Sequence, residues 1–411
     1  MLKNYVLTAY KVFMRRKLFT AINLLCIVLT LTILLVVTAM LENTLNPGGA
    51  EDKSGRFLEV AYMQSTSPDG HRTRSGALGF KLVEHYLKPL KWAQTVATVS
   101  LPQAVSIYQD GRIIPLLLRR ADAPYWKVLD FKLVAGRVPD QDDVDHARLV
   151  AVLNASNAER LFGGAAVGKK LAVGAQSFEI IGVVEDSHSA NALADLWAPI
   201  STYPSSEYRN QIAGNFVALL LARSAAEMGA LRAEVAAVEK TIVFEDPSKW
   251  KSAHLRADSK FDAFARGMPG VPEGEAACGA AMGVVAALMF LFMLLPALNL
   301  VNLNMGRIME RSAEIGVRKS FGATSAELVR QFVLENILLC LAGGAISLLC
   351  AQAFMLWLGA SGLIPHFHAT VDPAVFAWGL LITVVFGLVS GCLPAWRMAR
   401  LDPVHALKGI A

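Results

Sequence analysis

Cysteine is scarce in this sequence, and the longest stretch without it is informative. The chain has five cysteines in 411 residues, and each lies in or at the end of an apolar block: Cys26, Cys278, Cys340, Cys350 and Cys392. Residues 42–277 contain none, so this segment forms no disulfide and is long enough to bury a core of its own. No cysteine–histidine cluster is present, and His366 and His368 have no obvious third ligand. We therefore expect no metal site.

Charge is scarce as well, and its distribution is uneven. Charged residues make up 18% of the chain, against roughly 25% in ordinary soluble domains, while 54% of the residues are hydrophobic. We place apolar spans of sufficient length to cross about 30 Å of hydrocarbon at residues 18–41, 278–303, 331–358 and 373–396. The first exceeds the length of a signal-peptide apolar region, so we expect an uncleaved anchor. The sequence thus predicts a membrane protein with four transmembrane helices.

The first two spans contain no acidic or basic residue. The fourth has none before Arg397, and Glu335 lies near the start of the third, where an interfacial position costs little. Proton relays and ion pathways place ionisable groups inside the bundle, so a channel or secondary transporter is not expected. Two glycine pairs at i, i+4 spacing would allow helices to approach closely: Gly279 with Gly283, and Gly387 with Gly391.

Lysine and arginine cluster beside the predicted spans in some of the short flanking segments and are missing from another. They precede the first span, occupy residues 304–330 between the second and third, and follow the fourth, whereas residues 359–372 have none. The positive-inside rule therefore places both termini and residues 304–330 in the cytoplasm, and residues 42–277 outside. These flanks account for the net charge of +5, so no nucleic-acid partner is expected. Residues 1–17 have an amphipathic pattern and predict an interfacial helix against membrane lipids, and residues 397–411 form a cytoplasmic tail.

The external segment alternates strand and helix patterns. "GRFLEVAYMQ" and "NFVALLLARS" favour strands, and "GFKLVEHYLKPL" and "AAEMGALRAEVAAVEKTI" favour helices. Two hairpins are indicated, one around Asp110–Gly111 and one in "KKLAVGAQSFEIIGVVED". We predict an α+β domain inserted between the first and second transmembrane helices. No catalytic set stands out in it, and Asp186 and His188 are most simply solvated turn residues.

One glycine-rich stretch, "LFGGAAVGKKLAVG", is close to a phosphate-binding loop. Gly163, four residues, then Gly168 and Lys169 match the spacing, but Lys170 replaces the Ser or Thr that would hold Mg²⁺. A helix capped at Asn154 is expected before it and a hairpin after it, the reverse of the strand-to-helix order that the loop requires. We interpret it as a helix-to-strand turn in an external domain without an ATP supply.

The cytoplasmic segment "NMGRIMERSAEIGVRKSFGATSAELVRQFVLEN" interleaves charged and apolar residues. A short helix with one charged and one apolar face would dock into a groove on a soluble partner, although a solvated loop that only marks topology explains the pattern equally well. This segment resembles the MacB/FtsX-type permease subunits of ABC transporters. So do the chain's opening "MLKNYVLTAYKVFMRRKLFTAINLL" and the exit from the fourth span, "LPAWRMARLDPVHALKG". "LVAGRVPDQDD" and "LFGGAAVGKK" resemble the MacB-like periplasmic core domain.

The resemblance implies a function and a site. Residues that match the segment contacting the ATPase subunit are Glu310, Arg311, Glu314, Ile315, Gly316, Arg318, Lys319, Phe321, Gly322 and Ala323. It implies a non-catalytic subunit of the bacterial inner membrane that works with a second permease, identical or related. A separate cytoplasmic ATPase would bind ATP and Mg²⁺, so we expect no cofactor on this chain. ATP hydrolysis would drive movement of the periplasmic domain, a mode called mechanotransmission.

Three functions are compatible with that resemblance. The favoured one is efflux or export from the periplasm, with an adaptor and an outer-membrane channel as further partners. The second is lipoprotein extraction of the LolC/LolE kind, which would need a periplasmic chaperone. The third is FtsX-like signalling to periplasmic enzymes, for which the external domain is large. The core-domain motifs favour the first over the second.

Overall fold

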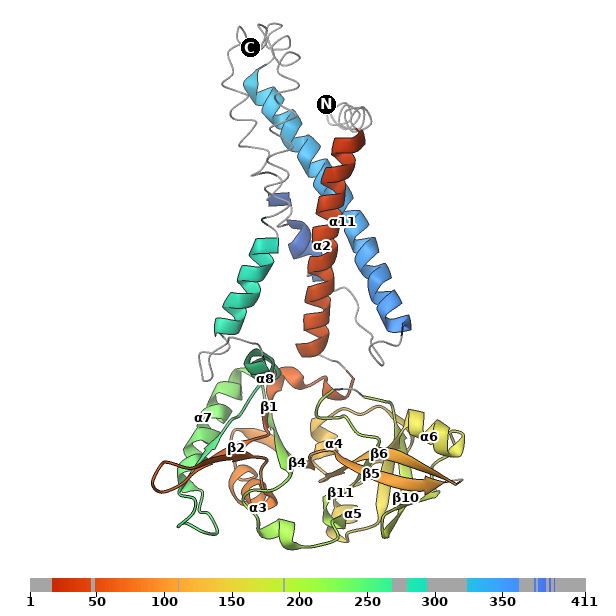
Figure 1. The fold of residues 1–411 in the computed structure, drawn as a ribbon, viewed down its shortest axis with the longest axis vertical. Helices are drawn as coiled ribbons and strands as arrows, with labels where there is room; N and C mark the ends of the chain where they lie inside the picture. Colours follow the sequence, from red (N-terminus) through yellow and green to blue (C-terminus); the bar gives the residue numbers. More distant parts are fainter. Residues whose placement is uncertain are drawn as a thin grey trace. The chain divides into compact units, whose positions relative to one another are not determined.

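The computed structural model describes residues 17–45, 49–109, 111–187, 189–267, 279–292, 294, 324–361, 373–374, 376–381, 384–385 and 388. The chain divides into two compact units, residues 44–278 and a second unit formed by residues 1–43 with 279–411 (Figure 1). The predicted interfacial helix at residues 1–17 lies almost wholly outside the described residues, and the tail at 397–411 lies outside them entirely.

Residues 44–278 are built on a mixed ten-stranded sheet. Its main order is β1-β12-β4-β6-β11-β8-β10-β7, with β5 pairing with β6 and β9 with β10. Most neighbours are antiparallel, but β8 and β10 are parallel, as are β6 and β11. The strands are β1 Phe57–Val60, β4 Ala93–Ser100, β5 Gln103–Gln109, β6 Arg112–Ala121, β7 Leu133–Gly136, β8 Val150–Asn154, β9 Lys170–Val173, β10 Gln176–Val184, β11 Leu196–Pro199 and β12 Phe216–Ala222.

A second, three-stranded sheet has the order β13-β2-β3. Its strands are β2 Met63–Thr66, β3 Thr73–Gly76 and β13 Ser252–Leu255. The single strand predicted from "GRFLEVAYMQ" is therefore wrong: β1 belongs to the large sheet and β2 to the small one. Ala61 and Tyr62, between the two strands, fit a strand as well as a bend, so their composition does not reveal the change of sheet.

Short helices connect and cover the strands, which confirms the predicted α+β class. The α-helices are α3 Phe80–Leu82, α4 Tyr125–Val128, α5 Gln141–Asp145, α6 Ala155–Phe162, α7 Met228–Val238 and α8 Lys260–Gly267. A π-helical turn, η3 Val83–Leu87, continues α3. The 3-10 turns are η1 Gly49–Glu51, η2 Ser54–Arg56, η4 Ile200–Thr202, η5 Glu207–Asn210, η6 Ala225–Glu227 and η7 Glu239–Thr241.

The sheet is buried on both faces where it is most apolar. All seven residues of β12, "FVALLLA", are buried, the pattern of a strand covered from both sides. Three hydrophobic clusters fill the unit, and the largest fully buried side chains are Trp197, Tyr125 and Phe57. Trp197 packs edge-on against Trp126 and Phe131, so aromatic contacts reinforce the burial of apolar area.

The stretch that is close to a phosphate-binding loop is a helix-to-strand turn, as predicted. Asn154 caps α6 by accepting a hydrogen bond from the backbone N–H of Asn157, and the helix ends at Gly163, whose φ of 62° suits glycine. Gly168, with φ of 82°, turns the chain into the β9–β10 hairpin. Lys169 is exposed in this turn.

The helical unit contains two helices that are long and apolar enough to cross a membrane. They are α2, Lys17–Leu45, with the span Thr20–Glu42, and α11, Ser325–Ala360, with the span Val333–Ala360. A shorter apolar helix covers Gly279–Phe292. Residues 295–323 and 389–411 lie outside the described residues, so the four predicted spans and the predicted domain limits stay predictions.

Candidate functional site

The predicted coupling residues, Glu310 to Ala323, lie outside the described residues, but the helix that follows them is described. Thr324 caps α11: its hydroxyl accepts from the Glu327 backbone N–H at 3.3 Å, and the Glu327 carboxylate accepts from the Thr324 N–H at 3.0 Å. These hydrogen bonds hold the pKa of Glu327 below its usual value. The cap starts α11 at Ser325, two positions after Ala323, the last of the predicted coupling residues. The pattern Thr-x-x-Glu could have predicted this start.

Helices α2 and α11 pack side by side (Figure 1). Ile27 and Leu31 are buried against Leu339 and Cys340, and farther along, Ala39 is buried with Met355 and Leu358. Residues later in α2 contact residues later in α11, so the two helices run in the same direction. The Thr32 hydroxyl donates to the Ser347 carbonyl at 3.4 Å between these two contact regions.

Two adjacent glycines of α11 allow close contacts, one with α2 and one with Leu380. A Cβ at Gly343 would lie 2.5 Å from the Ile27 side chain, and one at Gly344 would lie 2.4 Å from that of Leu380. A Cβ at Gly279 or Gly283 would meet no atom of the described chain within 4 Å. Gly387 and Gly391 lie outside the described residues, so a packing role for all four predicted glycines stays a prediction.

Three polar side chains are buried near the N-terminal ends of these helices. Asn23 of α2 is fully buried, and Glu335 and Asn336 of α11 are each 2% exposed. The side chain of Glu335 is therefore covered by protein, and its interfacial position stays a prediction. Sequence periodicity could not show this, since the polar residues fall on the face that packs against another helix.

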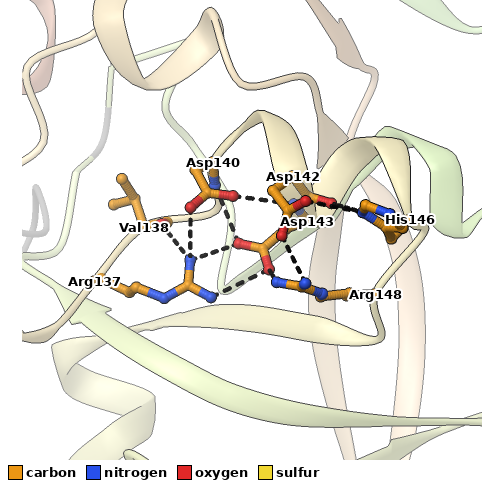
Figure 2. Close-up of polar contacts among 7 residues, drawn as sticks. All are labelled: Arg137, Val138, Asp140, Asp142, Asp143, His146 and Arg148. Atoms are coloured by element: carbon orange, nitrogen blue, oxygen red, sulfur yellow. Dashed lines mark hydrogen bonds and ion pairs between the residues drawn. The ribbon is translucent and has the colours of Figure 1, made fainter.

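In the external unit, the segment "GRVPDQDDVDHAR" folds around one carboxylate (Figure 2). The Asp143 side chain is fully buried, and both its oxygens accept from the Arg137 guanidinium, one of them at 3.1 Å. Arg148 also donates to it, at 3.3 Å. Asp140 and Asp143 form the capping box of α5. The hydrogen bonds from Arg137 make the largest contribution to lowering the pKa of Asp143 to about 2.

This cluster ties successive parts of the sheet together. Arg137 follows β7, Asp143 belongs to α5, and Arg148 precedes β8, so one carboxylate joins three elements. Gly136 has a φ of 74°, and a Cβ there would lie 2.1 Å from the Ile181 carbonyl oxygen. The Gly-Arg and Asp of this motif therefore serve folding: glycine lets β7 approach β10, and the arginine neutralises a buried carboxylate.

Asp186 does more than the solvated turn residue that was expected. Its carboxylate accepts from the backbone N–H of Ser156 at 3.1 Å and from the Ser156 hydroxyl at 2.7 Å. Ser156 lies in the first turn of α6, where a negative charge stabilises the helix, so the simple interpretation was incomplete. His188 lies outside the described residues, as do His366 and His368. Within the described ranges, no group of three or more His, Cys, Asp or Glu side chains could hold a metal ion.

Comparison with known families covers most of the chain. Residues 20–238 match the MacB-like periplasmic core domain, and residues 286–403 match the FtsX-like permease C-terminal domain. The macrolide export ATP-binding/permease protein MacB of Chromobacterium violaceum is 28% identical over 288 residues, covering 69% of this chain and 42% of that protein. The protein of the same name from Shewanella oneidensis is 26% identical over 336 residues, covering 78% of this chain and 47% of that protein.

The chain therefore spans less than half the length of these relatives. Among solved structures, the periplasmic region of MacB from Actinobacillus actinomycetemcomitans is similar, at 17% identity and a TM-score of 0.38. The similar region includes 54% of this chain and 98% of the MacB periplasmic region. Because the core-domain match alone includes more than half of the 411 residues and the permease match follows it in order, the chain belongs to the MacB/FtsX-like family of ABC transporter permeases, with a MacB-like periplasmic core domain.

Proposed function

We propose that this chain is the membrane subunit of a MacB-type ABC transporter and that a separate cytoplasmic ATPase powers it. The observation that carries the proposal is the order of the two family matches, an external core domain followed by a permease domain. Two relatives that match most of this chain are named macrolide export ATP-binding/permease proteins. In this proposal ATP and Mg²⁺ bind the partner ATPase, and this chain performs no catalysis.

In this proposal, movement of the ATPase displaces residues 304–323, and this displacement passes to α11 and to the helix packed against it. The cap at Thr324 supports it, because α11 is the described element that lies next in sequence to the predicted coupling residues. The register between α2 and α11 supports it as well, since contacts recur from Ile27 to Ala39. A movement of α11 would then be passed to α2, which leads directly into the external domain.

The remaining assignments follow from the same proposal. The chain lies in the bacterial inner membrane with four spans, both termini cytoplasmic and residues 42–277 in the periplasm. It acts as a dimer with a second permease, and export from the periplasm through an adaptor and an outer-membrane channel is the favoured outcome. Lipoprotein extraction and signalling to periplasmic enzymes are the outcomes that its partners would distinguish.

Co-purification in mild detergent tests the proposal. We expect a soluble ATPase with its own phosphate-binding loop, near one copy per permease, and ATP hydrolysis that the permease stimulates. Charge reversal at Glu314 or Arg318 should abolish that stimulation while the permease stays folded. Lys240→Glu, a reversal at an exposed residue of the external unit, is the matched control and should leave it intact. Recovery of the chain alone, or unchanged stimulation in the Glu314 and Arg318 variants, would contradict the coupling assignment.

A further inference from the structure

The two segments that connect the external unit to its flanking helices meet each other inside that unit. One is the chain that leaves α2, η1 to β1, and the other is the chain of β13 and α8 that leads toward the helix Gly279–Phe292. Glu59 of β1 and Asp258, just before α8, exchange both backbone hydrogen bonds, at 2.7 and 2.8 Å. β1 and α8 accordingly lie next to each other (Figure 1).

A buried ion pair joins the same two segments. The Lys260 ammonium, at the first residue of α8, lies 2.6 Å from Glu51 Oε2 at the end of η1. The Glu51 side chain is fully buried and that of Lys260 is 14% exposed. The lysine Nζ also lies 5.8 Å from the centre of the buried Phe57 ring. Separating the two charges would leave one or both buried without a counter-charge, which is costly.

The pair is anchored to the centre of the domain through Asn191. The Asn191 backbone N–H donates to Glu51 Oε1 at 3.0 Å, and its side-chain amide donates to Glu59 Oε2 at 3.0 Å. Its carbonyl accepts from the Tyr125 hydroxyl at 2.8 Å and from the buried Arg119 guanidinium at 3.2 Å. Asn191 therefore connects the exit from α2 with the core around Tyr125.

Further contacts hold each segment separately. The Ala50 carbonyl accepts from the Asp130 backbone N–H at 2.8 Å, and Lys53 forms an ion pair with the Asp130 carboxylate at 2.6 Å. At the other segment, the Arg266 guanidinium pairs with Asp258 and Arg232 pairs with Asp262. Each segment is thus attached to the domain by contacts of its own.

We propose that these contacts form a coupling junction, defined by Glu51, Glu59, Asn191, Asp258 and Lys260. The junction fastens the two attachments of the external domain to each other and to its core, so a displacement of either flanking helix moves the whole domain as one body. This inference rests on the proposed function and adds the residues through which movement enters the domain.

Stability alone does not account for the buried ion pair. A ten-stranded sheet with three apolar clusters has ample stabilising contacts, and an apolar pair of similar volume is often as stable as a buried ion pair. The position of the pair, bridging the points where the chain enters and leaves, is what a transmission role requires.

The first test breaks the junction in the complete complex with its ATPase. A spin label at Lys240→Cys on each permease reports the distance between the two external domains, with and without ATP and vanadate. In the otherwise native complex we expect the distance to shift with nucleotide. Lys260→Met should reduce that shift by at least about half while ATP hydrolysis changes by less than about twofold, because the pair is broken far from the ATPase. Lys132→Met, which breaks the exposed pair with Glu185 at 3.6 Å, is the matched control and should keep the full shift.

The outcomes separate the two proposals. No shift in the otherwise native complex would overturn the proposed function. A shift there that persists unchanged in Lys260→Met would overturn the coupling junction alone.

The second test replaces two side chains of the junction by a covalent bond between its two segments. Glu59 and Asp258 are a hydrogen-bonded antiparallel pair, whose Cα atoms are about 5.5 Å apart, a separation that a disulfide can bridge. Residues 44–277 contain no native cysteine, so in Glu59→Cys/Asp258→Cys the new bond is easily identified by mass spectrometry. The oxidised protein should keep the full nucleotide-dependent shift, and in the Lys260→Met background oxidation should restore it. Loss of the shift on oxidation would mean that the junction must open, which would overturn the proposal.

Discussion

The external unit, residues 44–278, and the helical unit, residues 1–43 with 279–411, differ in the interactions that stabilise each of them internally. Residues 44–278 combine a ten-stranded sheet, three apolar clusters and buried charges such as Asp143 and Glu51. The contact between α2 and α11 is mainly a row of small and aliphatic side chains, and Thr32 of α2 donates a hydrogen bond to the Ser347 carbonyl of α11. Directional contacts resist sliding, whereas apolar helix contacts permit the small displacements of shear motion. We therefore expect the external unit to resist deformation more strongly than the α2–α11 pair.

The largest effect should come from removing the central aromatic residue of the external unit. Trp197→Ala should lower the free energy of unfolding of that unit by about 3–5 kcal/mol, because the side chain is fully buried and packs against Trp126 and Phe131. This free energy is measured by denaturant unfolding of the full chain in detergent, with hydrogen exchange of the external unit as the readout. Trp92→Ala, at a residue 45% exposed, is the control. Equal effects of the two changes would contradict a core centred on Trp197.

Next in size is the loss of the buried carboxylate beside Arg137. Asp143→Asn should cost about 2–3 kcal/mol, because charge-assisted hydrogen bonds from two arginines and a helix cap are weakened together. Asp145→Asn, at an exposed residue of the same helix, should cost far less. Since the folded pKa of Asp143 is lowered to about 2, the contribution is present above the unfolded pKa and is lost as pH falls from about 4 to 2. An acid unfolding curve unchanged by Asp143→Asn would contradict this account.

Overfilling the helix contact should have a smaller effect, confined to the helical unit. Gly343→Leu would force atoms into the Ile27 side chain and should destabilise the α2–α11 pair by about 1–3 kcal/mol. Hydrogen exchange should rise in α2 and α11 and stay unchanged in the external sheet. Gly283→Leu is the control, because a Cβ there meets no described atom within 4 Å. Equal exchange in the α2–α11 pair of both variants would contradict the packing described.

The smallest effect concerns one buried acid whose charge the fold tolerates poorly. Burial raises the pKa of Asp122 to about 6, and the ammonium of Lys88, 3.3 Å away and also paired with Glu84, only partly opposes this. The folded state thus binds a proton that the unfolded state has released. Stability should rise by about 1 kcal/mol as pH falls from 7 to 5, and Asp122→Asn should remove this part of the pH dependence. An identical dependence in both proteins, measured by thermal unfolding, would contradict it.

Much of the external fold could be predicted from local patterns. The β5–β6 and β9–β10 hairpins, the Asn154 cap, β12 and α7 all follow from turn residues and periodicity close together in the chain. The switch from β1 to β2 could not be predicted, because strand propensity is the same on both sides of Ala61 and Tyr62. Short-range signals do not say which sheet a strand joins.

Sites that depend on distant partners were missed for the same reason. Glu51 and Lys260 are ordinary charged residues in the sequence, and only the fold places them 2.6 Å apart. Gly343 and Gly344 are adjacent in sequence, so they do not form the i, i+4 glycine pair that is typical of close helix packing. The "GRVPDQDD" motif carries part of the family resemblance, but its residue types do not show that the Asp143 side chain is buried. The family itself was predicted correctly, because its motifs are linear and occur in order.

Distance measurement in the assembled complex tests the central claim most directly. Spin labels at Lys169→Cys and Lys240→Cys, both exposed, report one distance within a single external domain. The same label on each of the two permeases reports a distance between domains. The account predicts that ATP with vanadate leaves the distance within a domain unchanged and shifts the distance between domains. A change within the domain, or no change in either distance while the bound ATPase hydrolyses ATP, would contradict a rigid domain driven through its flanking helices.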